Sequence, residues 1–196
     1  MNEIERLDYK IISNIIETGS NILDLGCGGG DLINYLQKTK NVRVQGIELD
    51  ENEIYKCVAK GLSVFHGDID DGLKSYPDKT FDYIILNQSL QEMIEIDYVL
   101  EESLRVGKKV IIGFPNFAYI FDRIKLFFRG RAPITKNLPY EWHDTPNIRF
   151  LSIKDFKDYC RKKKIQILDN FYLGENRKIF FLPNLFAPNA IFVVKK

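Results

Sequence analysis

A glycine-rich bend near the start of the chain constrains the fold more than any other feature. The segment "NILDLGCGGGD" at residues 21–31 joins a short apolar run to four glycines within five residues. Each glycine costs backbone entropy on ordering, so such a cluster indicates unusual dihedral angles or a ligand close to the main chain. Since "DLINYLQKT" at residues 31–39 has helical spacing, we expect a strand, a tight bend and a helix whose unpaired N–H groups face a ligand.

Strand-like and helix-like segments alternate along the rest of the chain. An opening helix is expected at residues 8–16. Further strands are expected at 42–49, 62–68, 81–88, 108–114, 165–173 and 190–196, and further helices at 50–61, 97–107 and 152–164. This alternation predicts right-handed βαβ units in a mostly parallel sheet with helices on both faces. We expect one domain over residues 1–196, with an irregular lid or insertion at about 115–150.

Composition and charge argue against several classes of protein. The formal net charge of +1 gives no excess of Lys and Arg for binding nucleic acid. The three cysteines and the two histidines are widely spaced, which predicts neither a disulfide framework nor a metal site. No apolar run reaches the roughly 18 residues of a membrane span, and the N-terminus does not resemble a signal peptide. We therefore expect a cytoplasmic protein that binds neither nucleic acid nor membranes.

The carboxylates around the glycine bend indicate which ligand it binds. A dinucleotide fingerprint would require glycine where the chain has Asp31, and Asp24 precedes the first glycine. A carboxylate is unfavourable beside a pyrophosphate but suits a cationic ligand, which argues against a nicotinamide dinucleotide. S-adenosylmethionine carries an ammonium, a sulfonium and a carboxylate but no phosphate. We predict that Asp24, Gly26, Cys27 and Gly28 bind this compound or S-adenosylhomocysteine.

The ends of the second and third strands supply further predicted contacts. Glu48 ends the second strand, where an acid can accept hydrogen bonds from both ribose hydroxyls. Asp68 ends the third strand and can accept a hydrogen bond from the adenine amine, although Gly-Asp is also common turn chemistry. Leu49 and Ile69 are expected to form apolar walls around the adenine ring.

The fourth strand is predicted to bring a side-chain amide to the reactive methyl group. It ends in "LNQ", so Asn87 or Gln88 lies at its carboxyl end, although Asn87 could instead cap a helix. Cys27 suits a small packing role better than that of a nucleophile, because no base is visible beside it in the sequence. The sequence therefore assigns no catalytic residue.

The order of these motifs resembles that of the class I S-adenosylmethionine-dependent methyltransferases. The matching segments are "ILDLGCGGG", "GIELD", "HGDID" and "FDYIILNQSLQEM", within residues 20–114. Together with them, "DDGL", "LEESLRVGKK" and "LPYEWHDTPNI" extend a resemblance to the MetW family of methionine biosynthesis proteins over residues 20–165. The resemblance implies a Rossmann-like sheet of seven strands whose last strand is antiparallel.

The same resemblance implies a partner without naming a reaction. The family is associated with the homoserine O-acyltransferase step of methionine synthesis, as a partner or activator of that enzyme. One hypothesis is therefore a protein that binds the cofactor, or its demethylated product, as a sensor and regulates the acyltransferase. The alternative is an active methyltransferase that acts on an unidentified small acid or related metabolite, because fold alone does not supply the reaction.

Two aromatic segments outside the alternating pattern have open interpretations. Tyr140, Trp142 and His143 lie in "LPYEWHDTP", which suits a lid with substrate contacts or a loop whose Trp142 packs on the core. The amphipathic run "YIFDRIKLFFRGR" suits packing in the core or a lid, docking of a partner protein, or a membrane surface. For "KIFFLPNLFAPN", near the C-terminus, core burial is expected, with an exposed interface as the alternative.

Overall fold

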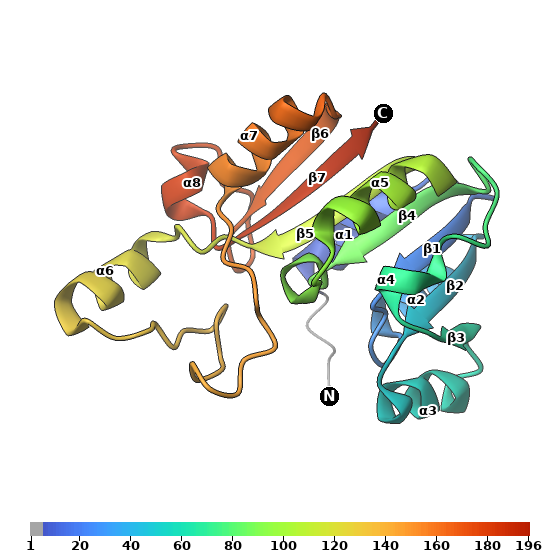
Figure 1. Cartoon of the computed structure of the whole chain (residues 1–196), viewed down its shortest axis with the longest axis horizontal. Coiled ribbons are helices and arrows are strands. Elements are labelled where there is room, and N and C mark those ends of the chain that lie inside the picture. The colour runs from blue at the N-terminus through green and yellow to red at the C-terminus, as the bar shows by residue number, and fades with distance from the viewer. Residues whose placement is uncertain (1–5) are drawn as a thin grey trace.

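The computed structural model describes residues 6–196, in which seven strands form one sheet (Figure 1). The strands are β1 (Asn21–Leu25), β2 (Arg43–Glu48), β3 (Val64–His66), β4 (Phe81–Asn87), β5 (Gly107–Pro115), β6 (Gln166–Leu173) and β7 (Asn189–Lys195). Their order in the sheet is β3-β2-β1-β4-β5-β7-β6. The first five strands pair in parallel, whereas β7 is antiparallel to both β5 and β6. The predicted Rossmann-like fold with a reversed last strand is therefore confirmed.

Helices cover the two faces of the sheet through separate apolar clusters. One face packs against α1 (Leu7–Ile15), α2 (Asp31–Thr39) and α3 (Glu51–Ala59). The other face packs against α4 (Ile69–Gly72), α5 (Ile96–Val106) and α7 (Ile153–Lys163). Along β4, Tyr83 and Ile85 belong to the first cluster, while Ile84 and Leu86 belong to the second. Because both faces are buried, the central strands β4 and β5 contain the apolar runs YIIL and VIIGF.

The long elements other than α6 (Ile120–Arg129) lie within a few residues of their expected positions. Helix α6 falls in the segment that was expected to be irregular, and three short elements were not anticipated. The unexpected elements are α4, the 3₁₀ helix η1 (Leu90–Glu92) and α8 (Pro183–Phe186). Each is about one turn long, so none repeats often enough to show a helical period in the sequence. Within residues 6–196 no helix is both long and apolar enough to cross a membrane.

Helix α6 (Ile120–Arg129) and the segment before β7 are exposed rather than packed in the core. In Figure 1, α6 lies apart from the sheet at one end of the molecule. Phe127 and Phe128 of α6 are 82% and 78% exposed, and Phe180 is 86% exposed. The interpretation of core burial is therefore wrong for both aromatic segments. The reason is that the other helices already cover the two faces of the sheet.

The sheet order reverses between β1 and β4. From β1 the chain builds outward through β2 and β3, and it then returns to place β4 and β5 on the other side of β1. In open α/β sheets, ligands bind beyond the carboxyl ends of the strands at this kind of reversal. The glycine bend follows β1 and Gln88 follows β4, so both lie at this reversal.

Candidate functional site

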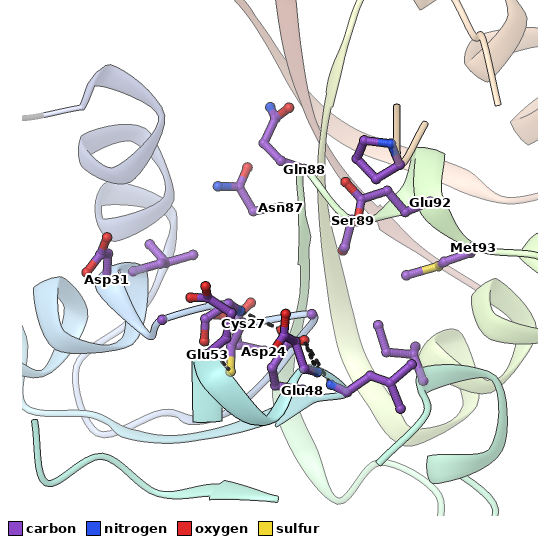
Figure 2. Close-up of a pocket in the computed structure, with 18 of the residues that line it drawn as sticks. Asp24, Cys27, Asp31, Glu48, Glu53, Asn87, Gln88, Ser89, Glu92 and Met93 are labelled. Atoms are coloured by element: carbon purple, nitrogen blue, oxygen red, sulfur yellow. Dashed lines mark hydrogen bonds between the residues drawn. The ribbon is translucent and has the colours of Figure 1, made fainter. Parts of the chain in front are cut away.

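A cavity of about 650 Å³ opens beyond the carboxyl ends of β1, β2 and β4 (Figure 2). Eleven of the predicted site residues line it: Asp24, Gly26, Cys27, Gly28, Glu48, Leu49, Asp68, Ile69, Asn87, Gln88 and Tyr140. In the view of Figure 2, Asn87 and Gln88 lie across the open space from Asp24 and Glu48. The fold thus gathers residues from the ends of four strands, together with one residue of the irregular segment.

Three glycines of the bend have left-handed backbone angles. The φ angles of Gly26, Gly28 and Gly30 are 71°, 51° and 74°, in a region that residues with side chains seldom adopt. A Cβ added at Gly30 would lie 2.5 Å from Leu62 Cδ1 and 2.8 Å from Cys57 Sγ, whereas one added at Gly28 would meet nothing within 4 Å. The bend is therefore closely packed at Gly30 and open at Gly28.

Gly30→Ala is expected to destabilise the ligand-free protein more than Gly28→Ala does. Both substitutions place a side chain at positive φ, at a cost of about 1–2 kcal/mol. Only Gly30→Ala also forces Leu62 and Cys57 to move, which adds about 1–3 kcal/mol. Urea denaturation of the two variants measures the difference in the free energy of unfolding. Equal losses in the two variants would contradict the close packing at Gly30.

Glu48 holds the bend through backbone hydrogen bonds. Its carboxylate accepts hydrogen bonds from the N–H groups of Gly28 at 2.7 Å, Leu49 at 2.8 Å and Asp50 at 2.9 Å. These bonds fix the carboxylate at the end of β2, where Glu48 lines the cavity. A carboxylate can accept about four hydrogen bonds, and three are already in place, so its oxygens keep capacity for about one hydroxyl group of a ligand.

Asp24 is a buried acid in the wall of the cavity. Its side chain lies on β1, and the residue is only 3% exposed. Burial, followed by the nearby negative charge of Glu48, raises the pKa of the Asp24 carboxyl to about 7. A cation that enters the cavity would stabilise the carboxylate form, so Asp24 is placed to ionise when a cationic ligand binds.

The described residues that line this cavity are strongly acidic. Seven carboxylic acids line it, namely Asp24, Asp31, Glu48, Asp50, Glu53, Asp68 and Glu92. Arg6 is the one Lys or Arg among these lining residues. Burial and the charge of Glu48 also raise the pKa of Glu92. Such a lining repels phosphate and attracts a cation, which favours a sulfonium ligand over a dinucleotide.

Cys27 lacks the properties of a nucleophile. Burial is the main cause that raises the pKa of its thiol well above the ordinary value. A Cβ added at Gly46 would lie 2.5 Å from its Sγ, so the thiol packs closely against β2. The packing role expected from the sequence therefore agrees with this environment.

Asn87 lines the first cavity, and Gln88 lies between that cavity and a second one. The side-chain amide of Asn87 donates a hydrogen bond to Asp8 Oδ2 at 3.1 Å, so Asn87 does not cap a helix. Gln88 lines both cavities and has a φ of 65°, which is rare for a residue other than glycine. Its N–H group donates to the carbonyl of Gly113 at 2.8 Å. Such strained turns often occur at functional sites.

The second cavity, of about 740 Å³, lies beside the ends of β4, β5 and β6 and the start of β7. It shares Arg6, Gln88, Glu92 and Tyr140 with the first cavity. Six side-chain amides line it: Gln88, Gln91, Asn137, Asn147, Asn176 and Asn189. Amides both donate and accept hydrogen bonds, so this cavity suits a small polar molecule.

Several lining residues of the first cavity were not anticipated from the sequence. Arg6 and Tyr9 come from the start of the chain, and Ser89, Glu92 and Met93 come from the turn that contains η1. The Arg6 guanidinium lies 4.2 Å from the centre of the Tyr9 ring. No sequence signal could reveal these residues, because only the folded chain brings them to the carboxyl ends of the strands.

The middle of the "LPYEWHDTP" segment does not reach either cavity. Trp142 is 80% exposed, so the interpretation that it packs on the core is wrong. Its ring contacts that of His143 with centroids 5.6 Å apart, and neither residue lines a cavity. Only Tyr140 and Pro146, on either side, reach the first cavity. A lid role for Trp142 and His143 stays a prediction that requires movement of this segment.

The sheet order, the reversed β7 and the glycine bend after β1 define the class I methyltransferase fold. A SAM-dependent methyltransferase from Archaeoglobus fulgidus has a TM-score of 0.68 and 16% identity, covering 96% of this chain and 94% of that one. An S-adenosylmethionine-dependent methyltransferase from Mesorhizobium loti has a TM-score of 0.70 and 13% identity, covering 96% and 97%. Similarity at these identities establishes the fold alone.

The chain belongs to the MetW family, whose model, described as "Methionine biosynthesis protein MetW", matches residues 6–194. The bifunctional methionine biosynthesis protein MetXA/MetW of Rhodopirellula baltica is 37% identical over 198 residues, covering 94% of this chain and 32% of that protein. The chain thus spans about a third of the length of this relative. The resemblance expected from the motifs is confirmed.

Proposed function

We propose that this protein binds S-adenosylmethionine, or S-adenosylhomocysteine, in the first cavity and acts with homoserine O-acyltransferase in methionine biosynthesis. The observation that carries the proposal is the acidic cavity at the glycine bend, with Asp24 buried in its wall beside Glu48. Membership of the MetW family supports the place in methionine biosynthesis. A relative that joins MetXA and MetW parts in one chain supports the partnership.

The charged lining residues match the charged and polar groups of this ligand. Glu48 would accept a hydrogen bond from a ribose hydroxyl, and Asp24 would face the ammonium group. Arg6, the cation among the described lining residues, would pair with the carboxylate of the methionine tail. Arg6 already pairs with Asp8 at 2.7 Å, so the ligand carboxylate would share this guanidinium with Asp8, while the sulfonium would lie within the acidic lining.

The adenine end would lie toward the start of α4. Asp68 would accept a hydrogen bond from the adenine amine, while Leu49 and Ile69 would contact the faces of the ring. All three residues line the cavity. Gly26 is close to Ile69, since a Cβ at Gly26 would lie 3.4 Å from Ile69 Cδ1, so a side chain there would narrow this end of the cavity.

A regulatory role follows from the position of the ligand in metabolism. S-adenosylmethionine is made from methionine, so occupancy of the cavity would report the supply of the end product to an earlier enzyme of the pathway. If the ligand changes the affinity of this protein for its partner, the partner must change the affinity for the ligand by the same factor.

Thermal unfolding is expected to show the ligand preference. A ligand at 100 times its dissociation constant adds about 2.7 kcal/mol of stability. For a chain of this size, that raises the melting temperature by about 5–10 °C. S-adenosylmethionine or S-adenosylhomocysteine should produce the shift, and NADH should not. A shift with NADH alone would contradict the proposed ligand.

An acyltransferase assay tests the regulatory part of the proposal separately. Adding the protein to the homoserine O-acyltransferase of the same organism should change the rate of acyl transfer. S-adenosylmethionine should change the size of that effect. An unchanged rate at every cofactor concentration would contradict regulation while leaving ligand binding to be judged by the melting experiment.

A second candidate function, methyl transfer to a small molecule, is favoured by the amide-lined second cavity. S-adenosylmethionine supplies an electrophilic methyl group, and Gln88 and Glu92 lie where the two cavities meet. Because burial raises the pKa of Glu92, its carboxylate is the group placed to take a proton from an acceptor. Incubation with methyl-labelled cofactor and a metabolite extract should yield a labelled product. Absence of label in every fraction would contradict this function.

A further inference from the structure

Helix α6 has its apolar side chains on the outside. Five large apolar residues of this ten-residue helix are exposed by 42–82%, namely Phe121, Ile124, Leu126, Phe127 and Phe128. The buried residue of the helix is instead an acid, Asp122, at 2% exposure. An amphipathic helix on a globular protein normally buries its apolar stripe and exposes its charges. The helix therefore presents its apolar side to a surface that residues 6–196 do not supply.

The orientation of α6 is held by contacts within its own segment. Lys125 Nζ donates to the carbonyl of Ile134 at 2.7 Å, which ties the helix to the chain that follows it. Arg123 Nε donates to the carbonyl of Ala118 at 2.5 Å, just before the helix. These contacts use the polar side chains of the helix and leave the aromatic side chains uncovered.

A second aromatic group lies in the same half of the molecule. Phe180, Phe181 and Leu182 are 86%, 73% and 54% exposed, and they immediately precede α8. Figure 1 shows α6 and α8 in the half of the molecule away from β3 and α3. Large exposed apolar patches on soluble domains usually mark interaction sites.

The charge around α6 argues against a second copy of this chain as the occupant. Arg123, Arg129 and Arg131 are exposed, and none forms an ion pair with any residue of the described range 6–196. Asp122 is buried, so it does not neutralise them at the surface. In a two-fold dimer through this face, both copies would bring the same unpaired arginines, and no exposed acid of α6, to the interface, which is electrostatically unfavourable.

We propose that α6 and the segment 180–182 form the docking surface for the homoserine O-acyltransferase, and this inference rests on the proposed function. The matching surface of the acyltransferase would combine an apolar depression for Phe127 and Phe128 with acidic side chains opposite the arginines. Aromatic residues and arginine are the residue types that carry most binding energy in protein interfaces. In the Rhodopirellula baltica relative, the MetXA and MetW parts belong to one chain, which favours a protein partner over a lipid surface.

The test compares a double variant with a matched control in direct binding to the purified acyltransferase. In Phe127→Ser with Phe128→Ser, affinity should fall by about 30-fold or more, as for aromatic interface anchors. The control is Tyr55→Ser on α3, which removes a helical aromatic residue that is 69% exposed at the opposite end of the molecule. It should bind like the original protein. Arg129→Glu should weaken binding, mainly through slower association.

The other outcomes show whether the docking surface or the partnership with the acyltransferase is wrong. If the unmodified protein binds the acyltransferase and the double variant binds equally well, the surface is wrong but the partnership stands. If the unmodified protein does not bind the acyltransferase with S-adenosylmethionine, with S-adenosylhomocysteine or with neither, both the partnership and the docking surface are wrong.

Two further controls test the rival occupants. Vesicles of equal parts phosphatidylcholine and phosphatidylserine test a lipid surface, and sedimentation velocity tests a second copy. The proposal would be overturned if the double variant lost binding to vesicles, or lost a dimer, while it kept its binding to the acyltransferase. All variants should retain the melting temperature and the cofactor affinity of the original protein, because the substituted side chains are exposed.

Discussion

Glu48→Ala is expected to weaken binding of S-adenosylmethionine by about 10-fold to 100-fold. The expected change is that for loss of one hydrogen bond from a ribose hydroxyl to a charged acceptor, worth about 1.5–3 kcal/mol. The substitution also removes the acceptor of three N–H groups at the bend and the start of α3, so the loop would lose part of its order before the ligand arrives. Isothermal titration calorimetry with S-adenosylmethionine measures the change.

A matched variant separates a ribose contact from a general loss of negative charge. Glu53 lines the same cavity and forms an ion pair with Lys56 at 2.5 Å. Glu53→Ala should therefore reduce affinity only a few-fold, through the weaker field of the cavity. Glu48→Gln keeps an acceptor for the ribose and should fall between the two. Equal affinities of Glu48→Ala and the original protein would show that the ligand lies elsewhere.

The sheet and its helices could be predicted from the sequence because the apolar residues that recur at strand or helix spacing are the residues that the fold buries. The expected helix at 31–39 coincides with α2, whose Leu32, Ile33 and Leu36 pack against the sheet. Helix α6 has the same kind of spacing, yet its apolar side is exposed. Periodicity shows that a helix has an apolar face, but it does not show which surface covers that face.

The candidate site was predictable to the extent that parallel topology determines it. The carboxyl ends of parallel strands share one edge of the sheet. Residues at or near the ends of strands, such as Asp24, Glu48 and Asn87, can therefore be assigned to one site from the sequence alone. Arg6 depends on how the chain enters α1, and Trp142 depends on the path of a long loop. Neither path follows from local propensity, because both are determined by tertiary contacts.

Binding of S-adenosylmethionine is expected to depend on pH through Asp24. Its pKa of about 7 in the ligand-free protein means that below pH 7 the carboxyl must lose a proton before it can face the ammonium. Affinity should therefore fall by up to tenfold for each pH unit below about 7. Above about pH 8 the α-amino group of the ligand loses its own proton, so affinity should be highest between about 7 and 8. Calorimetry in buffers of different ionisation enthalpy should show proton release below pH 7.

The same carboxyl links the stability of the ligand-free protein to pH with the opposite sign. Because the folded-state pKa of Asp24 is raised from 3.8 to about 7, the folded chain holds more protons than the unfolded chain in this window, and stability should fall as pH rises through it.

Asp24→Asn should remove this fall and also weaken S-adenosylmethionine binding by about 30-fold at pH 7.5, the cost of one charged contact. Asp31→Asn, which alters an exposed acid of the same cavity, should keep both profiles. 5′-Methylthioadenosine lacks the amino-acid tail, so its affinity should be flat across this range in every variant. An S-adenosylmethionine profile equally flat in the original protein would mean that the ammonium does not face Asp24.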